Sequence, residues 1–267
     1  MTETPRVLAL DFDGVLCDGR PEYFETARRA YAAVWPGADA AHASAVAARF
    51  AAARPLVESG WEMPLLLHAL VTGVPEAGLV DRDAWRGTAR RLLDGAPVDA
   101  GGLGRALNAA RDAWFAADPK DWLSHHAFYP GVCARVGRAL DEGVQVAIVT
   151  TKAERFARAL LAAEDPRLGT VPIIGREPGR TVPKPESLLR LARDHGLPAD
   201  GADLWFVEDM LETLELVRAT PGLARARLFL AGWGYNTLEQ RAVAGAEGHV
   251  VLLSLHDMEA PFVDWLR

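Results

Sequence analysis

The second half of the chain alternates short apolar runs with helical patterns, and this alternation limits the possible folds more than any other feature. Apolar runs that predict buried strands lie at 144–150, 170–174, 203–209, 227–232 and 249–253. Helical patterns lie near 153–163, 185–195, 211–219, 237–244 and 256–266. Strands and helices that alternate at this spacing predict a parallel sheet covered by helices on both faces. A further apolar run at 6–11 fits the same sheet.

The segment between that first run and residue 130 has a different character. It is rich in alanine and arginine, and helical periodicity recurs at 23–35, 40–57, 64–73, 82–95 and 103–118. We interpret the Gly-Gly-Leu-Gly stretch at 101–104 as a flexible joint, because it lacks the preceding strand that a phosphate-binding loop needs.

These patterns predict an α/β protein with a Rossmann-like, doubly wound parallel sheet and an inserted all-helical domain. We expect the core to comprise residues 1–17 and 128–267, and the helical domain to comprise residues 18–127.

Composition narrows the possible partners and the location of the protein. A formal net charge of −7 argues against a protein that coats nucleic acid or an anionic membrane. No segment approaches the roughly 20 apolar residues of a membrane span, and the N-terminus lacks the pattern of a signal peptide. With only Cys17 and Cys133, a reducing, cytoplasmic location is expected. Nothing in the sequence indicates an oligomeric state.

Polar residues gather where the predicted strands end. Asp11 and Asp13 follow the first strand, Thr150 and Thr151 end the strand at 144–150, and Glu208-Asp209 ends the strand at 203–209. Ligands of doubly wound sheets bind outside the carboxyl ends of the strands, so we expect these residues to share one edge. Carboxylate oxygens suit a hard cation such as Mg²⁺, and hydroxyl and ammonium groups suit phosphate oxygens.

Lysine is scarce in this chain, which has only Lys120, Lys152 and Lys184 among 29 basic residues. Because the chain otherwise uses arginine, a lysine at a given position hints that an ammonium group is needed there. Lys184 stands between two prolines and is expected at the same edge. Lys152 is interpreted mainly as a solvated lysine in the first turn of a helix, with contact to the site as the alternative.

Four segments, "DFDGVL", "VAIVTTK", "VPKP" and "WFVED", resemble the ordered motifs of the haloacid dehalogenase superfamily of phosphohydrolases. The helical insertion between the first and second motifs corresponds in position to the family's helical cap. The resemblance implies that Asp11 is the nucleophile that becomes an aspartyl-phosphate, and that Asp13 is the general acid and base. It implies that Gly14 turns the chain and brings its amide to the phosphate, that Thr150 and Thr151 bind the phosphoryl group, and that Lys184 neutralises it.

The same resemblance implies a Mg²⁺ site formed by the Asp11 side chain, the Asp13 main-chain carbonyl and Asp209, with Glu208 acting directly or through water. Many members have a further acid at the position of Thr213, so Glu212 is held in reserve as an alternative to Glu208.

The function expected is Mg²⁺-dependent hydrolysis of a small phosphorylated metabolite. A phosphosugar mutase of the same superfamily and a non-catalytic binding protein with this fold are the alternatives. A dehalogenase is disfavoured because Asp13 is present, and a phosphonate hydrolase because only Lys120 could form a Schiff base in the helical domain. The sequence does not identify the substrate. The segment Trp233-Gly234-Tyr235-Asn236 follows a predicted strand, and site and structural roles for it are weighed equally.

Overall fold

The computed structural model describes residues 3–37, 40–177 and 180–266. The chain divides into two compact units, one formed by Met1–Asp18 with Ala127–Arg267 and the other by Gly19–His126. The sequence predicted boundaries between residues 17 and 18 and between residues 127 and 128. The observed boundaries lie between residues 18 and 19 and between residues 126 and 127.

The larger unit is built on a parallel sheet, as the sequence predicted. Its strands lie in the order β5-β4-β1-β7-β8-β9, with a short β6 antiparallel to β5 at one edge. Their bounds are β1 Val7–Leu10, β4 Gln145–Thr150, β5 Ile173–Glu177, β6 Arg180–Thr181, β7 Leu204–Glu208, β8 Arg227–Ala231 and β9 Val250–Leu253. The first strand, β1, lies between β4 and β7, so the order of connection reverses there. Such a switch point is where ligands of this fold class bind.

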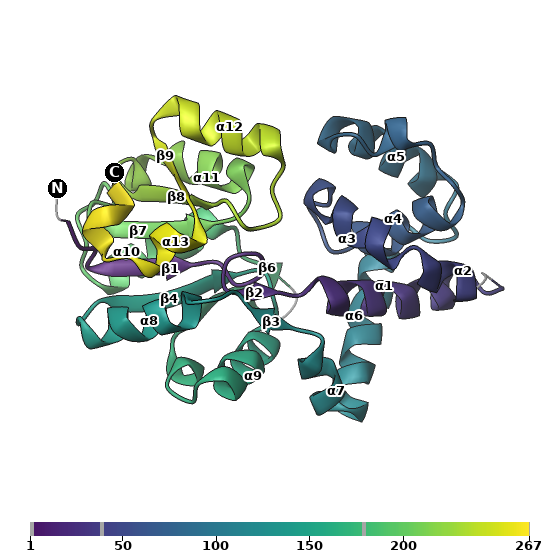
Figure 1. Ribbon diagram of the computed structural model, residues 1–267, viewed down its shortest axis with the longest axis horizontal. Helices are drawn as coiled ribbons and strands as arrows, with labels where there is room; N and C mark the ends of the chain where they lie inside the picture. Colours follow the sequence, from purple (N-terminus) through teal and green to yellow (C-terminus); the bar gives the residue numbers. More distant parts are fainter. Residues whose placement is uncertain (1–2, 38–39, 178–179, 267) are drawn as a thin grey trace. The chain divides into compact units, whose positions relative to one another are not determined.

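Helices cover both faces of this sheet (Figure 1). Their bounds are α8 Val132–Asp141, α9 Glu154–Glu164, α10 Lys184–Asp194, α11 Leu211–Arg218, α12 Leu238–Glu247 and α13 Leu255–Glu259, with 3₁₀ turns η3 Leu168–Thr170, η4 Pro221–Leu223 and η5 Phe262–Leu266. On one face, Val7 and Ala9 of β1 pack in the core cluster with Leu188 of α10 and Leu214 of α11. On the other face, Trp205 of β7 packs against Trp265 of η5. The central strand is therefore buried on both sides, which explains its uninterrupted apolar run.

Two elements of this unit differ from the prediction. The strand expected at 170–174 is preceded by η3 and begins only at Ile173, after Pro172. The helix expected at 256–266 is divided into α13 and η5 at Pro261. Proline has no amide hydrogen and its ring clashes with the preceding turn, so the α-helix cannot continue through this position.

The helical unit is inserted between two short paired strands. β2, Cys17–Asp18, pairs antiparallel with β3, Ala127–Phe128, so the chain leaves and rejoins the larger unit side by side. The unit contains α1 Arg20–Val34, α2 Ala40–Ala45, α3 Ala47–Ala53, η1 Arg54–Leu56, α4 Glu62–Val71, η2 Glu76–Gly78, α5 Arg82–Asp94, α6 Ala100–Ala117 and α7 Pro119–Ser124.

The prediction of a flexible joint at 101–104 was wrong, because these residues lie inside α6. The side chain of Asp99 caps this helix by accepting a hydrogen bond from the Gly102 amide at 2.7 Å. Asp is among the best N-cap residues, and the glycines in the first turn are tolerated because a side-chain acceptor satisfies one of the free amides.

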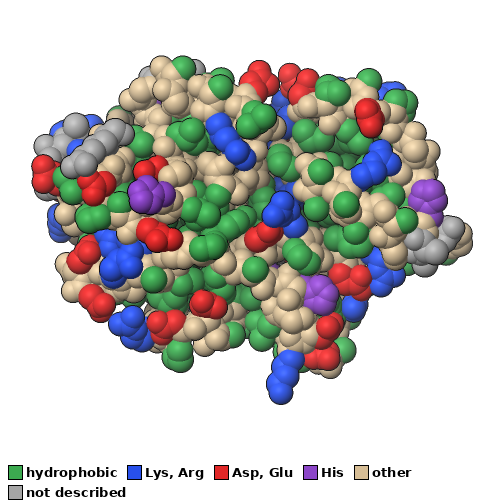
Figure 2. All heavy atoms as spheres, in the orientation of Figure 1, with side chains coloured by type: hydrophobic (Ala, Val, Ile, Leu, Met, Phe, Trp, Pro, Cys, Tyr) green, Lys and Arg blue, Asp and Glu red, His purple; other side chains and the backbone are tan. Residues whose placement is uncertain are grey.

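The surface of the chain carries charges of both signs. Acidic and basic side chains are interspersed over the face drawn in Figure 2. Among the residues that the structure describes, none of the helices is both long enough and apolar enough to cross a lipid bilayer.

Candidate active site

The first two acids lie just beyond the central strand. The chain leaves β1 at Leu10, and the Asp11 amide still donates to the Val207 carbonyl of the neighbouring strand at 2.9 Å. Asp11 is 6% exposed, and Asp13 is half-buried in the turn that follows. Gly14 makes this turn possible with a φ of +85°, a conformation that other residues rarely adopt.

Each of these acids contacts its own lysine. Lys184, the first residue of α10, places its Nζ 2.9 Å from Asp11 Oδ1 and 2.5 Å from Glu208 Oε2. Lys152 places its Nζ 3.0 Å from Asp13 Oδ1. The two carboxylates of the first motif therefore have different electrostatic environments, which suits groups with different tasks.

The interpretation of Lys152 as a solvated first-turn lysine was wrong. α9 begins at Glu154, and Lys152 lies in the preceding loop with only 8% of its surface exposed. Its amide donates to Thr150 Oγ1 at 3.1 Å, which directs the chain back over the end of β4. The scarcity of lysine in this arginine-rich chain was the sequence signal for this contact.

Three buried carboxylates meet at the ends of β1 and β7. Asp11, Glu208 and Asp209 each offer an oxygen atom, and these atoms lie within 4.8 Å of one another. Lys184 is the ammonium group that contacts Asp11 and Glu208, so two of the three acids share one lysine. Asp11 Oδ1 is buried, and no described residue donates a well-aligned hydrogen bond to it. Buried carboxylate oxygen atoms gathered in this way fit a hard divalent cation such as Mg²⁺.

The acid–base properties of these groups follow from the same arrangement. Burial raises the pKa of Asp11 above its ordinary value, although Lys184 opposes this shift. Burial also raises the pKa of Glu208 well above its ordinary value, with Lys184 again acting in the opposite direction. The pKa of Lys184 is raised because the attraction of Asp11 and Glu208 outweighs the effect of burial, so this lysine stays charged.

Asp209 is enclosed by two glycines from separate loops. A Cβ atom at Gly14 would lie 2.0 Å from Asp209 Oδ2, and a Cβ atom at Gly234 would lie 2.3 Å from Asp209 Cβ. The Tyr235 amide donates to Asp209 Oδ2 at 2.8 Å, and Asn236 Nδ2 donates to the Asp209 carbonyl at 2.9 Å. The segment 233–236, whose role the sequence left open, therefore contacts one of the cluster acids directly.

The expected phosphate-binding residues are arranged unequally. Thr150 is buried at the end of β4, whereas Thr151 is exposed. The Gly14 amide donates to the Cys17 carbonyl at 2.9 Å, so the expected hydrogen bond from this amide to a phosphate is not available. The hydrogen bond within the turn uses this amide. Gly14 instead contributes a positive φ and the absence of a side chain next to Asp209.

The reserve metal ligand Glu212 lies outside the acid cluster formed by the described residues. It accepts a hydrogen bond from Gln240 Nε2 at 2.7 Å, which ties α11 to α12. Glu208, by contrast, belongs to the cluster.

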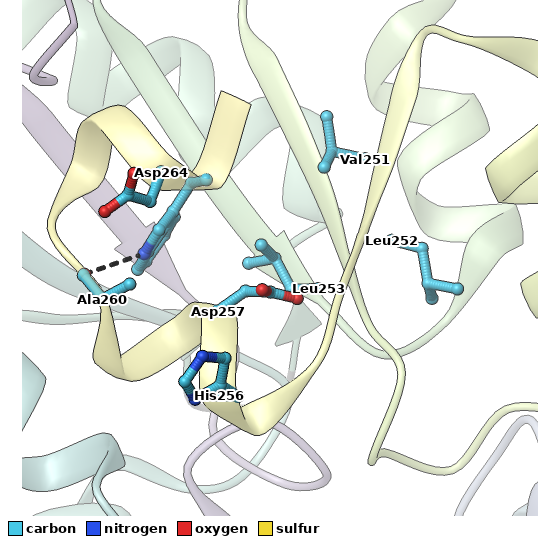
Figure 3. Close-up of a pocket in the computed structure, with 8 residues that line it drawn as sticks. Val251, Leu252, Leu253, His256, Asp257, Ala260 and Asp264 are labelled. Atoms are coloured by element: carbon cyan, nitrogen blue, oxygen red, sulfur yellow. Dashed lines mark hydrogen bonds between the residues drawn. The ribbon is translucent and has the colours of Figure 1, made fainter. Parts of the chain in front are cut away.

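A pocket elsewhere in the larger unit contains none of the motif residues. It has a volume of about 340 Å³ and lies between β9 and the C-terminal turns, with Leu253, His256 and Trp265 among its walls (Figure 3). The Trp265 indole donates to the Ala260 carbonyl at 3.2 Å, so this polar group is already satisfied. The acids and lysines of the motifs lie at the strand ends instead.

Comparison with known proteins agrees with this geometry. The family model for haloacid dehalogenase-like hydrolases matches residues 5–215. The chain belongs to this family. The matched region spans all four motifs and the helical unit inserted between the first and the second. A search of curated proteins gives no significant match.

Solved structures share the fold of this family member at low sequence identity. A protein from Lactobacillus delbrueckii subsp. bulgaricus, provisionally named a phosphoglycolate phosphatase, is 15% identical with a TM-score of 0.62, and the match covers 94% of this chain and 95% of that one. A predicted phosphatase from Clostridium acetobutylicum is 13% identical with a TM-score of 0.61, covering 96% and 97%. A protein from Thermotoga maritima, provisionally named a β-phosphoglucomutase, is 17% identical with a TM-score of 0.52, covering 95% and 96%.

Proposed function

We propose that this chain is a magnesium-dependent phosphomonoesterase that transfers a phosphoryl group to Asp11 and then to water. The observation that carries the proposal is the position of Asp11. Its carboxylate lies 2.9 Å from Lys184 Nζ within a cluster of three buried acids, two of which share that one ammonium group. Such a cluster is costly for folding alone, and a divalent cation would offset its negative charge.

Asp11 would attack phosphorus as the bond to the ester oxygen breaks. Lys184 holds the carboxylate in its ionised form and would offset the charge of the phosphoryl group. Asp13 would give its proton to the departing ester oxygen. In the second half of the reaction Asp13 would take a proton from water, which attacks phosphorus, releases inorganic phosphate and restores Asp11.

Lys152 enters the proposal as the residue that orients Asp13. It is buried, its Nζ lies 3.0 Å from Asp13 Oδ1, and its amide is bound to Thr150 Oγ1. A carboxylate held in this way points in one direction, whereas a free side chain in a turn samples several. Thr150 would bind a phosphoryl oxygen, with Thr151 beside it at the mouth of the site.

The Mg²⁺ ligands in this proposal are the Asp11 side chain, the Asp13 main-chain carbonyl and Asp209, with Glu208 acting directly or through water. When bound, the cation would neutralise the phosphate and align it with the nucleophile. The support for this ligand set is the closeness of the three carboxylates and their burial.

The substrate class follows from the chemistry of this site and the family, and we propose a small phosphorylated metabolite. The helical unit is proposed as the cap that selects it, because its two connections, β2 and β3, directly adjoin the segment that carries Asp11 and Asp13. The solved phosphatases and the mutase of similar fold carry names that agree with phosphoryl transfer.

The test is phosphate release from p-nitrophenyl phosphate and from a panel of metabolite monoesters, with and without Mg²⁺. Asp11→Asn, which keeps the size of the side chain, is expected to abolish turnover. In the wild type, mass spectrometry after rapid acid quenching is expected to find a phosphoryl adduct on Asp11. Mg²⁺-independent turnover, or full turnover by Asp11→Asn, would contradict the mechanism.

The same panel separates the mutase alternative. A phosphosugar mutase would interconvert hexose phosphates with little net phosphate release and would need a bisphosphate to start the cycle. A non-catalytic protein would bind Mg²⁺ or phosphate esters but release no phosphate from any member of the panel.

A further inference from the structure

The segment Trp233–Asn236, between β8 and α12, joins three parts of the larger unit. The Trp233 indole donates to the Val15 carbonyl at 3.1 Å, in the turn that follows Asp13. The Tyr235 hydroxyl donates to Asp18 Oδ1 at 3.1 Å, and the Tyr235 amide donates to Asp209 Oδ2 at 2.8 Å. The segment therefore contacts the first motif, the short strand β2 and the acid cluster.

Asn236 is held in one orientation. Its Nδ2 donates both to the Asp209 carbonyl at 2.9 Å and to the Ala231 carbonyl at 2.8 Å. Arg241 Nε donates to Asn236 Oδ1 at 2.6 Å, which assigns oxygen and nitrogen of the amide without ambiguity. Asn236 is 2% exposed, so these bonds are made away from water, where an unpaired amide would be costly.

The backbone of the segment lies against Asp209. A Cβ atom at Gly234 would approach Asp209 Cβ to 2.3 Å and the Gly14 carbonyl oxygen to 2.6 Å. Only glycine permits this approach, and it brings the Tyr235 amide within hydrogen-bond distance of the carboxylate. Asp209 therefore accepts hydrogen bonds at its carboxylate from the Tyr235 amide and at its main-chain carbonyl from the Asn236 side chain.

We propose that the Tyr235 main-chain amide and the Asn236 side chain are positioning groups that fix Asp209 for cation binding, the amide at its carboxylate and Asn236 at its main-chain carbonyl. An amide hydrogen bond to a carboxylate is charge-assisted, and it sets the rotation of the carboxylate group. Groups that orient metal ligands typically change metal affinity by 10- to 100-fold when they are removed. The inference rests on the proposed function, because it assigns Asp209 to the Mg²⁺ site.

The alternative is a purely structural loop whose bonds only connect β8 to α12. The two roles differ in one measurable respect. A structural residue changes the thermal stability of the metal-free protein and leaves Mg²⁺ affinity unchanged, whereas a positioning residue changes Mg²⁺ affinity.

The experiment is isothermal titration of Mg²⁺ into the full chain, with the melting temperature of each metal-free variant measured in parallel. Asn236→Ala is expected to raise the Mg²⁺ dissociation constant by about 10-fold or more. Tyr235→Phe keeps the amide bond to Asp209 and removes the hydroxyl that donates to Asp18. Its dissociation constant is expected to stay within about twofold of the wild type, well short of that orienting-group effect.

Thr237→Ala is the matched control. Thr237 is the adjacent residue and caps α12 through its bond from the Gln240 amide. This variant is expected to lower the melting temperature and to keep the Mg²⁺ affinity of the wild type. If Asn236→Ala does not fold, Arg241→Ala removes the donor that orients Asn236 and is expected to weaken Mg²⁺ binding in the same direction.

The outcomes separate this inference from the proposed function. If the wild type binds Mg²⁺, Asp209→Asn does not, and Asn236→Ala binds as the wild type does, the positioning role is wrong and the metal site stands. An equal loss of affinity in Thr237→Ala would also overturn the positioning role. If the wild type binds no Mg²⁺ with or without phosphate, the proposed function and this inference both fail.

Discussion

The helical unit and the catalytic core both bury carboxylates, but they treat them differently. In the helical unit, Glu22 is fully buried and accepts hydrogen bonds from Arg111 Nε at 2.7 Å, Thr26 Oγ1 at 2.5 Å and Trp122 Nε1 at 3.3 Å. In the core, three buried carboxylates lie together, and two of them, Asp11 and Glu208, contact Lys184.

The difference concerns the balance of charge. Arg111 matches Glu22 with one positive charge and further donors satisfy its oxygen atoms, so Glu22 needs nothing from solution. In the core, Asp11 and Glu208 share Lys184, and burial raises the pKa of both carboxyl groups. A buried carboxylate alone is therefore not evidence of a site. Several buried carboxylates that share one cation indicate where a ligand of positive charge belongs.

The largest expected effect comes from removing the lysine of the core cluster. In Lys184→Ala, kcat/KM for an aryl phosphate is expected to fall by about 10²- to 10³-fold, because Asp11 loses the cation that keeps it ionised and offsets the phosphoryl charge. Steady-state kinetics at saturating Mg²⁺ measures this loss. A loss below tenfold would mean that the core cluster does not depend on Lys184 and that the comparison is wrong.

The corresponding change in the helical unit is expected to affect stability. Arg111→Ala leaves Glu22 without its charge partner, and the side chains of Arg111 and Glu22 are only 12% and 0% exposed. Breaking such a buried pair costs about 3–5 kcal/mol in the free energy of unfolding. Chemical denaturation measures this change. Turnover per folded molecule is expected to stay near that of the wild type, and the paired variant Glu22→Gln/Arg111→Met is expected to recover part of the stability.

A smaller effect is expected at Lys152 and Asp13, where one lysine contacts one acid. Lys152→Met keeps the aliphatic length of the side chain but releases Asp13, and kcat is expected to fall by about 10²-fold, within the range of general acid–base contributions. Formation of the phosphoryl adduct in single-turnover experiments should slow with a leaving group that needs protonation, and much less with p-nitrophenolate. Equal slowing with both leaving groups would contradict an orienting role for Lys152.

The smallest expected effect is a pH dependence of the metal-free protein. Because the folded protein raises the pKa of Glu208 above its ordinary value of 4.5, the folded state holds a proton that the unfolded chain releases. The stability of the metal-free protein is therefore expected to fall as pH rises above about 4.5, by about 1.4 kcal/mol for each unit by which the pKa is raised. Denaturation across pH, with and without Mg²⁺, measures the slope.

Glu208→Gln is the control for this prediction, because it removes the titrating group and keeps the shape. Its metal-free stability is expected to depend less on pH than that of the wild type. An identical slope in the two proteins would show that Glu208 does not hold this proton.

Much of the fold was predictable from local patterns. The apolar runs of the core do not alternate because the strands are buried on both faces, and this property is legible in the sequence. Two failures arose where single residues override a pattern. Pro261 divides the last predicted helix into two elements. Asp99 caps α6, whose first turns contain the glycines that the sequence analysis interpreted as a flexible joint.

The site was predictable where its residues lie in motifs and unpredictable where they depend on neighbours. Asp11, Glu208 and Asp209 meet as the strand ends predicted. The contact between Lys152 and Asp13 joins residues far apart in the chain, and only the pairing of β1 with β4 brings them together. The Gly14 amide was assigned to phosphate because the sequence does not reveal that the turn uses it.

The sequence by itself determined the α/β core, the helical insertion and the gathering of Asp11, Glu208 and Asp209 at the strand ends. Strand burial and motif order are local properties, so they can be recognised without coordinates. The tertiary structure decided which lysine serves which acid, and that Glu208 rather than Glu212 joins the cluster. It also decided that the segment 233–236 supports Asp209. Charge balance depends on distances between segments that are remote in sequence, and only the packed sheet sets those distances.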